Sequence, residues 1–280
     1  MGRMTGKPES ADGYDPAYTD IARQTCLYVA TKLGDCMDSA VVVGGLVPGL
    51  LTDQDGVEYD PHVGTLDLDL GLALGLFDNE RYREISGRLR GAGFEPDRNE
   101  EGNLTRQRWR MSDGSGVKVD FLIPMLGESS RPGDIQGLEA DFAAILTPGL
   151  DLAFRDYRRI DLFDRTLRSE TATRSICVCG PGAFVVLKAL AFESRGENKD
   201  AYDLYYVVRN LAGGPREVAA QVSCLTDHAA TRKALAIVRR DFTGHDEVGA
   251  QRVARFLHGG PDDETQADVV GFFSAFLEAL

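Results

Sequence analysis

The sequence predicts an α+β protein in which strands and helices share the first part of the chain and helices alone fill the rest. Period-two alternation and short apolar runs, the patterns typical of strands, recur between about residues 40 and 180. Apolar residues at helical spacing follow from Phe184 onward. The chain has 280 residues and is 43% apolar, which is enough for one large or two smaller units with a proper core.

Composition narrows the class of protein. The 31 basic and 44 acidic residues give a net charge of −13, which disfavours indiscriminate nucleic-acid binding because such binding relies on neutralised phosphates. This net charge does not exclude a local basic patch on the surface. Without a run of 18 apolar residues, no membrane span is expected.

The N-terminus and the cysteines predict the compartment. Residues 1–14 are polar and have no apolar segment of the secretory type, so we expect a flexible tail over residues 1–15. The five cysteines are odd in number and include no CxxC pair. This usage favours reduced thiols and a cytoplasmic location.

The first elements are a helix over residues 16–33 and a strand over 40–43. The strand is a continuous apolar run, typical of a fully buried strand, and it leads directly into Gly44 and Gly45. Glycines at such a strand end allow a ligand or another backbone to approach closely. A plain turn is the alternative.

The next strand, residues 64–71, carries the central motif. Its leucines alternate onto one face, and Thr65, Asp67 and Asp69 point to the other. The two carboxylates then stand roughly 6.5–7 Å apart at the backbone and repel unless a cation lies between them. Oxygen ligands of this kind suit Mg²⁺. The alternative is a solvent-facing strand edge.

A helix over residues 78–90 precedes a predicted hairpin of strands 104–111 and 117–123. Matching the apolar faces of the two strands places Arg108 opposite Asp120. Arg106, Arg108 and Arg110 share this polar face. The row is either a salt-bridged surface or a guide for an RNA acceptor.

The segment 127–175 has no clean period, although 140–146 and 157–163 are candidate strands, and 176–179 is a further strand. In the following helix Lys188 is the one charge within the apolar run 184–192, so its ammonium should face carboxylates or phosphates unless it reaches water. A helix beginning at Lys199 and four amphipathic helices complete the chain.

Five motifs occur in a fixed order: Gly44-Gly45, Thr65-Leu66-Asp67-Leu68-Asp69, Val119-Asp120-Phe121, Leu187-Lys188-Ala189 and Lys199-Asp200-Ala201-Tyr202-Asp203-Leu204. Over about residues 41–210 this set resembles the DNA polymerase β-like nucleotidyltransferase superfamily, and most of all its AbiEii-type members, many of which are toxins. The resemblance implies a catalytic domain over 16–180, built on a mixed sheet flanked by helices. It also implies a helical domain over 181–280 that completes the cleft.

The resemblance also implies roles for individual residues. Asp67, Asp69 and Asp120 would hold Mg²⁺ or Mn²⁺, with Asp120 activating the acceptor hydroxyl. Gly44, Gly45, Thr65 and Lys188 would bind the triphosphate of an NTP, and Asp200 matches a position that is often essential. Gly45 departs from the pattern, because many relatives have Ser there.

The implied function is transfer of a nucleoside monophosphate from an NTP to a hydroxyl group. The acceptor is a tRNA 3′ end, as in AbiEii-type toxins, a small molecule or a protein. The negative charge favours a small molecule and the arginine row favours RNA. A cognate antitoxin is an expected partner if the protein is a toxin. The alternative function is a catalytically degenerate module that binds a partner.

Overall fold

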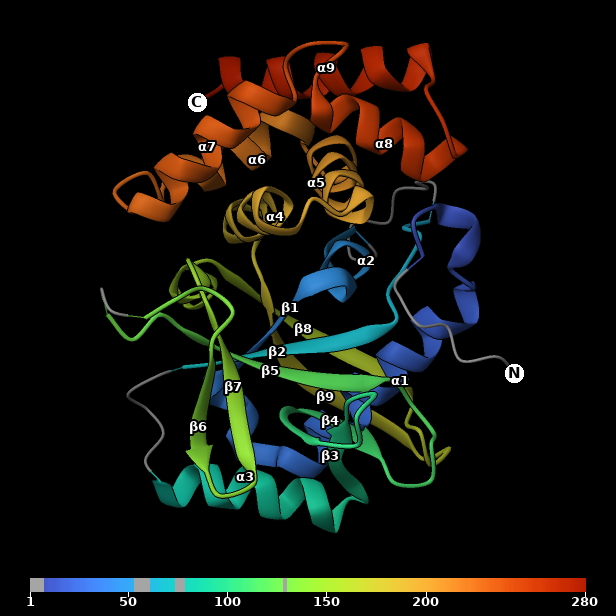
Figure 1. Ribbon diagram of the computed structural model, residues 1–280, viewed down its shortest axis with the longest axis vertical. Coiled ribbons are helices and arrows are strands. Elements are labelled where there is room, and N and C mark those ends of the chain that lie inside the picture. The colour runs from blue at the N-terminus through green and yellow to red at the C-terminus, as the bar shows by residue number, and fades with distance from the viewer. Residues whose placement is uncertain (1–7, 53–60, 74–78, 128–129) are drawn as a thin grey trace.

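The computed structural model describes residues 8–52, 61–73, 79–127 and 130–280 (Figure 1). It confirms the predicted α+β class, because a mixed sheet is flanked by helices and is followed by helices to the end of the chain. The Asp, Gly and Pro content of residues 52–63 predicts a loop. This loop and the start of the helix expected at residue 78 lie partly outside the described residues.

Three strands at the centre of the sheet position the site: β1 (Ala40–Val43), β2 (Asp67–Leu72) and β5 (Lys118–Pro124). Strand β2 pairs antiparallel with β1 and parallel with β5. The order along the sheet is β3-β4-β5-β2-β1-β9-β8, and β7 joins both β5 and β6. The outer strands are β3 (Phe94–Arg98), β4 (Leu104–Met111), β6 (Ile135–Glu139), β7 (Phe142–Thr147), β8 (Tyr157–Arg165) and β9 (Thr171–Cys179).

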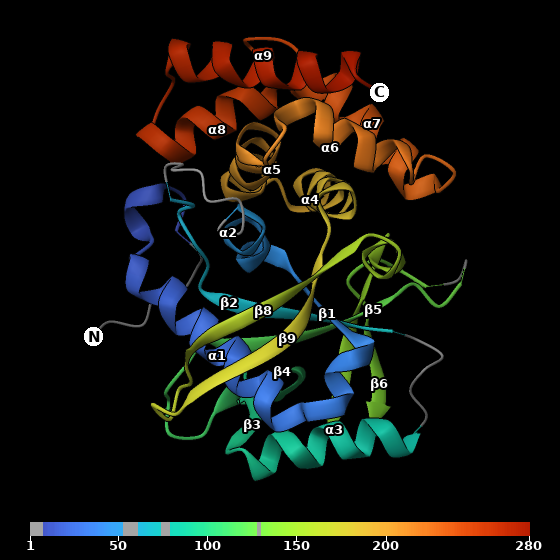
Figure 2. The same ribbon diagram turned by 180° about the vertical axis from the view of Figure 1, so that it is seen from behind.

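Three α-helices in the described ranges belong to the sheet half of the molecule. Helix α1 (Pro16–Leu33) packs against β8 and β9, as Figure 2 shows from behind, and α3 (Asn79–Gly91) packs against β3 and β6. The short helix α2 (Val47–Thr52) follows β1. The bounds of α1 and β1 agree with the sequence predictions, since a continuous apolar strand and a well-spaced helix are strong signals.

The helical half consists of α4 (Pro181–Arg195), α5 (Asn198–Asn210), α6 (Gly214–Ser223), α7 (Ala229–Asp241), α8 (Val248–His258) and α9 (Asp263–Glu278). Helices α4 and α5 lie nearest the sheet, and the others cover their far side (Figure 1). The side chain of Asp156 caps α4 by accepting a hydrogen bond from the Ala183 N–H at 2.7 Å. None of the helices in the described ranges is long and apolar enough to cross a membrane.

Residues 8–15 differ from the expected flexible tail. The ring of Tyr14 is buried, with 8% exposure, in a cluster with Tyr202, Tyr206 and Phe256. The Asn198 side chain also donates a hydrogen bond to the Glu9 carbonyl at 3.0 Å. An aromatic anchor therefore holds this segment against α5 and α8. The five cysteines are all free thiols, as predicted.

Candidate functional site

Three carboxylates meet at the centre of the sheet. Asp67 and Asp69 extend from β2 and Asp120 from β5, and the parallel register places Asp69 beside Asp120. One oxygen of each carboxylate lies within 4.8 Å of the others. Asp67 is 9% exposed and Asp120 is 4% exposed. The expected convergence of the three acids is therefore observed, and their metal-binding role stays a prediction.

The opposite face of the same strands fixes this arrangement. Leu68, Leu70, Val119 and Phe121 have no exposed surface. Because side chains alternate along a strand, burying these four residues on one face forces the acids onto the other. A shift of one residue in either strand would bury the carboxylates in the core.

The two glycines after β1 pack directly against this strand pair. Gly44 has a φ of +73°, and a Cβ atom there would lie 1.9 Å from Asp69 Oδ2. A Cβ at Gly45 would lie 2.7 Å from Thr65 Oγ1. No side chain fits at Gly44, and one at Gly45 would displace the Thr65 hydroxyl.

The Thr65 side chain contacts the first carboxylate of the motif, that of Asp67. Its hydroxyl lies 3.0 Å from Asp67 Oδ1 and donates to it, while the residue itself is buried. This contact orients the Asp67 carboxylate. The nucleotide-binding roles of Thr65, Gly44 and Gly45 stay predictions.

The predicted register of the β4–β5 hairpin is confirmed, because Arg108 lies opposite Asp120. Arg108 Nε donates to Asp120 Oδ1 at 2.6 Å, and a second guanidinium nitrogen binds the other oxygen. The hydrogen bonds that Arg108 donates to Asp120 raise the pKa of Arg108 against the opposing effect of burial. The Asp120 carboxylate therefore forms a bidentate ion pair with the Arg108 guanidinium.

The arginine row separates into different contacts. Arg106 donates to the Ala140 carbonyl at 3.2 Å, and Arg110 binds Glu95 at 2.7 Å. Of the three arginines, only Arg108 lies in the wall of the large cavity described below. The role of this row in guiding an RNA acceptor stays a prediction.

Lys188 reaches the same cleft from α4. Its ammonium lies 3.0 Å from Asp200 Oδ1 and 2.7 Å from Asp203 Oδ2, and the residue is 7% exposed. Burial lowers the pKa of Lys188, but the two nearby carboxylates outweigh burial and raise it. The ammonium therefore stays charged at the cavity wall, facing carboxylates as the sequence indicates.

Three members of this network were not singled out from the sequence: Asp203, Arg195 and His62. Asp203 accepts from Lys199 at 2.5 Å and Arg195 binds both oxygens of Asp200 at 2.7 and 2.8 Å. Asp203 follows Asp200 by three positions and Lys199 by four, which places these residues on one face of α5. That spacing is the signal that would have found Asp203.

His62 lies in the segment before β2. Its Nδ1 accepts from the Gly64 N–H at 3.1 Å, so Nε2 carries the proton and donates to Asp203 at 2.8 Å. Burial lowers the pKa of His62 to about 4, against the opposing effect of Asp203. The imidazole is therefore neutral at physiological pH.

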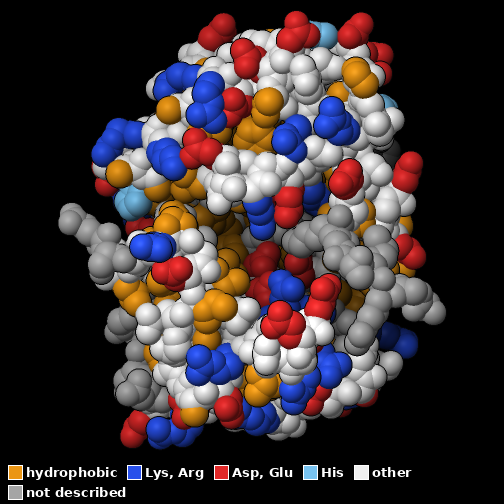
Figure 3. Space-filling model, viewed as in Figure 1, with side chains coloured by type: hydrophobic (Ala, Val, Ile, Leu, Met, Phe, Trp, Pro, Cys, Tyr) orange, Lys and Arg blue, Asp and Glu red, His pale blue; other side chains and the backbone are white. Residues whose placement is uncertain are grey.

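Two cavities meet beside the three carboxylates and share part of their lining: Asp67, Asp69, Lys188, Arg195 and Glu197. The smaller has a volume of about 30 Å³ and is lined by polar residues including Thr65 and Lys199. The larger, of about 490 Å³, lies beside Asp120 and between α4 and the segment after β7. In Figure 3 the hollow has acidic and basic side chains at its base and hydrophobic side chains along one wall.

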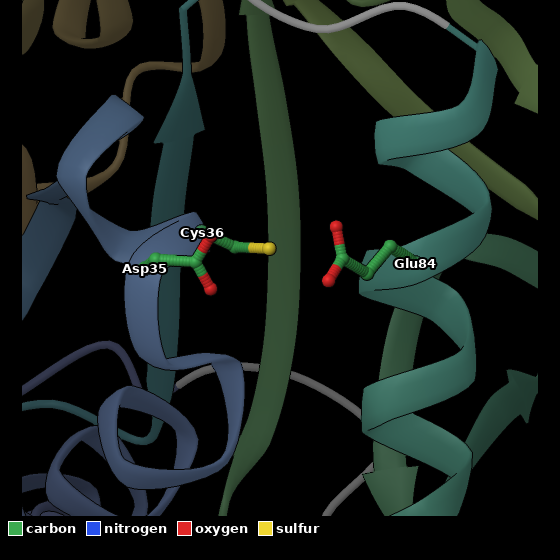
Figure 4. Close-up of side chains that lie close together, drawn as sticks. All are labelled: Asp35, Cys36 and Glu84. Atoms are coloured by element: carbon green, nitrogen blue, oxygen red, sulfur yellow. The ribbon is translucent and has the colours of Figure 1, made fainter.

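A second group of metal-ligand residues has a different environment. Asp35 and Cys36 face Glu84 of α3, with their ligand atoms within 4.8 Å of one another (Figure 4). Arg81 binds Asp35 at 2.6 Å and Glu84 at 2.7 Å, and Arg88 binds Asp35 at 2.7 Å. Burial raises the pKa of the Cys36 thiol, which keeps it protonated. This group is an ion-pair cluster rather than a metal centre.

No protein-family model and no curated protein matches the chain. Among solved structures, the chain is similar to the crystal structure of an antigenic nucleotidyltransferase-like protein from Paracoccidioides brasiliensis, with 14% identity and a TM-score of 0.38. The match covers 78% of this chain and 94% of that chain. Function is therefore inferred below from this chain's own residues.

Proposed function

We propose that this protein is a metal-dependent nucleotidyltransferase that moves a nucleoside monophosphate from an NTP to an acceptor hydroxyl. The observation that carries this proposal is the meeting of Asp67, Asp69 and Asp120 at the base of a cleft, on two adjacent parallel strands. The ordered motifs that resemble polymerase β-like nucleotidyltransferases support it. We further propose that residues 16–180 form the catalytic domain and residues 181–280 the domain that completes the cleft.

The residues present fit a divalent cation. Carboxylate oxygens are the ligands that Mg²⁺ and Mn²⁺ prefer. Gly44 keeps the space beside Asp69 Oδ2 free of a side chain, since a Cβ atom there would lie 1.9 Å from that oxygen. When bound to these acids, a divalent cation would neutralise phosphate charge during transfer.

The chain's own groups have separate parts in this reaction. Thr65 orients Asp67 through its hydroxyl, and Asp120 faces the acceptor oxygen. Lys188 lies on α4, in the helical half, where Asp200 and Asp203 hold its ammonium in place. Its positive charge would face the phosphates of the NTP. The catalytic contribution is mainly positioning and charge stabilisation, as is general for phosphoryl transfer.

The resemblance to AbiEii-type proteins adds finer predictions. It suggests a toxin with a tRNA 3′ end as acceptor, a cognate antitoxin as partner and an essential role for Asp200. The contacts of Asp200 with Lys188 and Arg195 support a positioning role for this residue. The acceptor is considered separately below.

Calorimetry with and without Mg²⁺ tests the proposed function. The wild-type protein should bind an NTP only with the metal, and Asp69→Asn should lower nucleotidyl transfer at least about a thousandfold, because several kcal/mol of charge stabilisation is lost. Asp35→Asn, in the ion-pair cluster, is the matched control and should keep wild-type transfer.

Full transfer by a folded Asp69→Asn variant would contradict the proposal. The absence of NTP binding to the wild-type protein would also contradict it and would favour the partner-binding module.

A further inference from the structure

We propose that the acceptor is a small molecule that carries its hydroxyl group on an apolar body. It binds in the larger cavity, between α4 and the segment that links β7 to the 3₁₀ helix Leu150–Phe154. This inference rests on the proposed nucleotidyl transfer and names the class of acceptor.

The size and wall of the cavity indicate the chemistry of its ligand. Its volume of about 490 Å³ lies in the range of pockets that enclose one small molecule. Two opposed apolar surfaces line it: Phe184, Leu187, Leu190 and Ala191 from α4, and Ile145, Leu146, Pro148 and Leu150 from the other side. Burying an apolar body between them is favourable because it removes apolar surface from water.

The reactive end of this cavity is defined by β5. Asp120 and Leu122 are two positions apart on one face of the strand, and both line the cavity. The carboxylate therefore lies at the polar end of an apolar chamber. The smaller cavity is lined instead by Gly45 and Thr65, and Asp120 does not line it. A hydroxyl on an apolar body would lie with its oxygen towards Asp120.

The charges on the cavity wall disfavour an RNA acceptor. RNA binding requires cations that neutralise backbone phosphates. Among the described wall residues, the cations are Arg108, Lys188 and Arg195. Arg108 is bound by Asp120 and Arg195 by Asp200, and Lys188 already has a proposed role towards the NTP phosphates, so none is left for the phosphates of an RNA backbone. With a net charge of −13 as well, the surroundings favour an uncharged acceptor body.

The transfer balances without another reactant. The acceptor oxygen forms a bond to the α-phosphorus of the NTP, and the bond from that phosphorus to the pyrophosphate oxygen breaks. The hydroxyl proton is released to water. The products are a phosphodiester of the acceptor and pyrophosphate.

Labelling experiments test the acceptor class. The wild-type protein is incubated with Mg²⁺, each α-phosphate-labelled NTP, and either an oligoribonucleotide ending in CCA or a panel of primary alcohols bearing phenyl, indolyl or octyl groups. The proposal expects label on at least one alcohol and none on the RNA. Label on the RNA with none on the alcohols would overturn it, and so would Mg²⁺-dependent NTP binding without any labelled alcohol. Loss of NTP binding itself would instead contradict the proposed function.

Substitutions in the apolar wall locate the acceptor. Leu190→Arg places a charge there and should lower transfer to the alcohols about tenfold or more, with NTP affinity kept within about twofold. Leu104→Arg is the matched control, because Leu104 is 51% exposed on β4, away from the cavity. Ala191→Phe narrows the cavity without a charge and should give the same loss. An equal loss of NTP affinity in these variants would assign the wall to the nucleotide and overturn the proposal.

Discussion

Two groups of three ligand-type side chains occur in the described part of this molecule, and in each group the ligand atoms all lie within 4.8 Å of one another. Asp67, Asp69 and Asp120 stand on central strands at the base of a cavity. Asp35 and Glu84 lie at the surface, where Arg81 and Arg88 already bind their carboxylates. Spacing alone therefore does not identify a candidate metal centre. Burial, counter-charges and access to a cavity separate the two groups.

The ion pairs near the two groups should also differ in energy. The ion pairs that Lys188 forms with Asp200 and Asp203 are buried, because the side chains of these two acids are at most 1% exposed. In the other group, the side chain of Asp35 is 55% exposed. Breaking a buried pair leaves an uncompensated charge, but water solvates an exposed one. Three measurements test this contrast.

The largest effect is expected for Lys188→Met. It leaves Asp200 and Asp203 without their shared ammonium and should lower the free energy of unfolding by about 3–5 kcal/mol. Urea unfolding measures this change. Arg81→Met, in the exposed cluster, should leave the midpoint nearly unchanged. Equal losses in the two variants would remove the distinction between the regions.

A smaller effect is expected from pH, through His62. Its folded pKa of about 4 lies below the unfolded value of about 6.5, so the unfolded chain binds the additional proton between these values. Stability is then complete above about pH 6.5 and falls as the pH drops towards 4, by roughly 3 kcal/mol. His62→Gln should lose this dependence in urea titrations at neutral and acidic pH, while His258→Gln keeps it. Parallel pH profiles for the wild type and His62→Gln would contradict this assignment.

The smallest effect is expected at the candidate centre itself. Arg108 holds both oxygens of Asp120, so Arg108→Gln should raise the affinity for Mg²⁺ in the absence of NTP by about tenfold or less. Arg110→Gln is the control, because Arg110 binds Glu95. Calorimetry compares the two variants. Unchanged affinity in Arg108→Gln would mean that the guanidinium does not compete with the metal.

The sequence predicts the central strands and the facing of their acids, because alternation is strong where one face is fully buried. The register of the β4–β5 hairpin follows from the same principle, and it correctly places Arg108 opposite Asp120. Where a strand is only partly buried, the alternation of apolar and polar residues that predicts it is lost. The first half of β9 is largely exposed, so its polar residues give no strand pattern.

Two strands escape prediction for related reasons. Pro96 argues against a strand in β3, yet β3 lies at the edge of the sheet, where a missing N–H is tolerated. Strand β6 contains Gly137 and no fully buried residue. Contacts between distant segments also could not be predicted from the sequence. His62 and Asp203 are 141 positions apart, and neither residue alone indicates the other.

The parallel pairings around the candidate centre have a consequence for the order of folding. Strand β2 meets β5, and β1 meets β9 through Val42 and Val178, so the site joins segments that are remote along the chain. Pairings that close long loops are slow to form, whereas the β8–β9 hairpin and the helices need only local contacts. The three acids therefore come together late, after most local structure has formed. A cation that binds them would act on the completed fold, slowing unfolding rather than speeding folding.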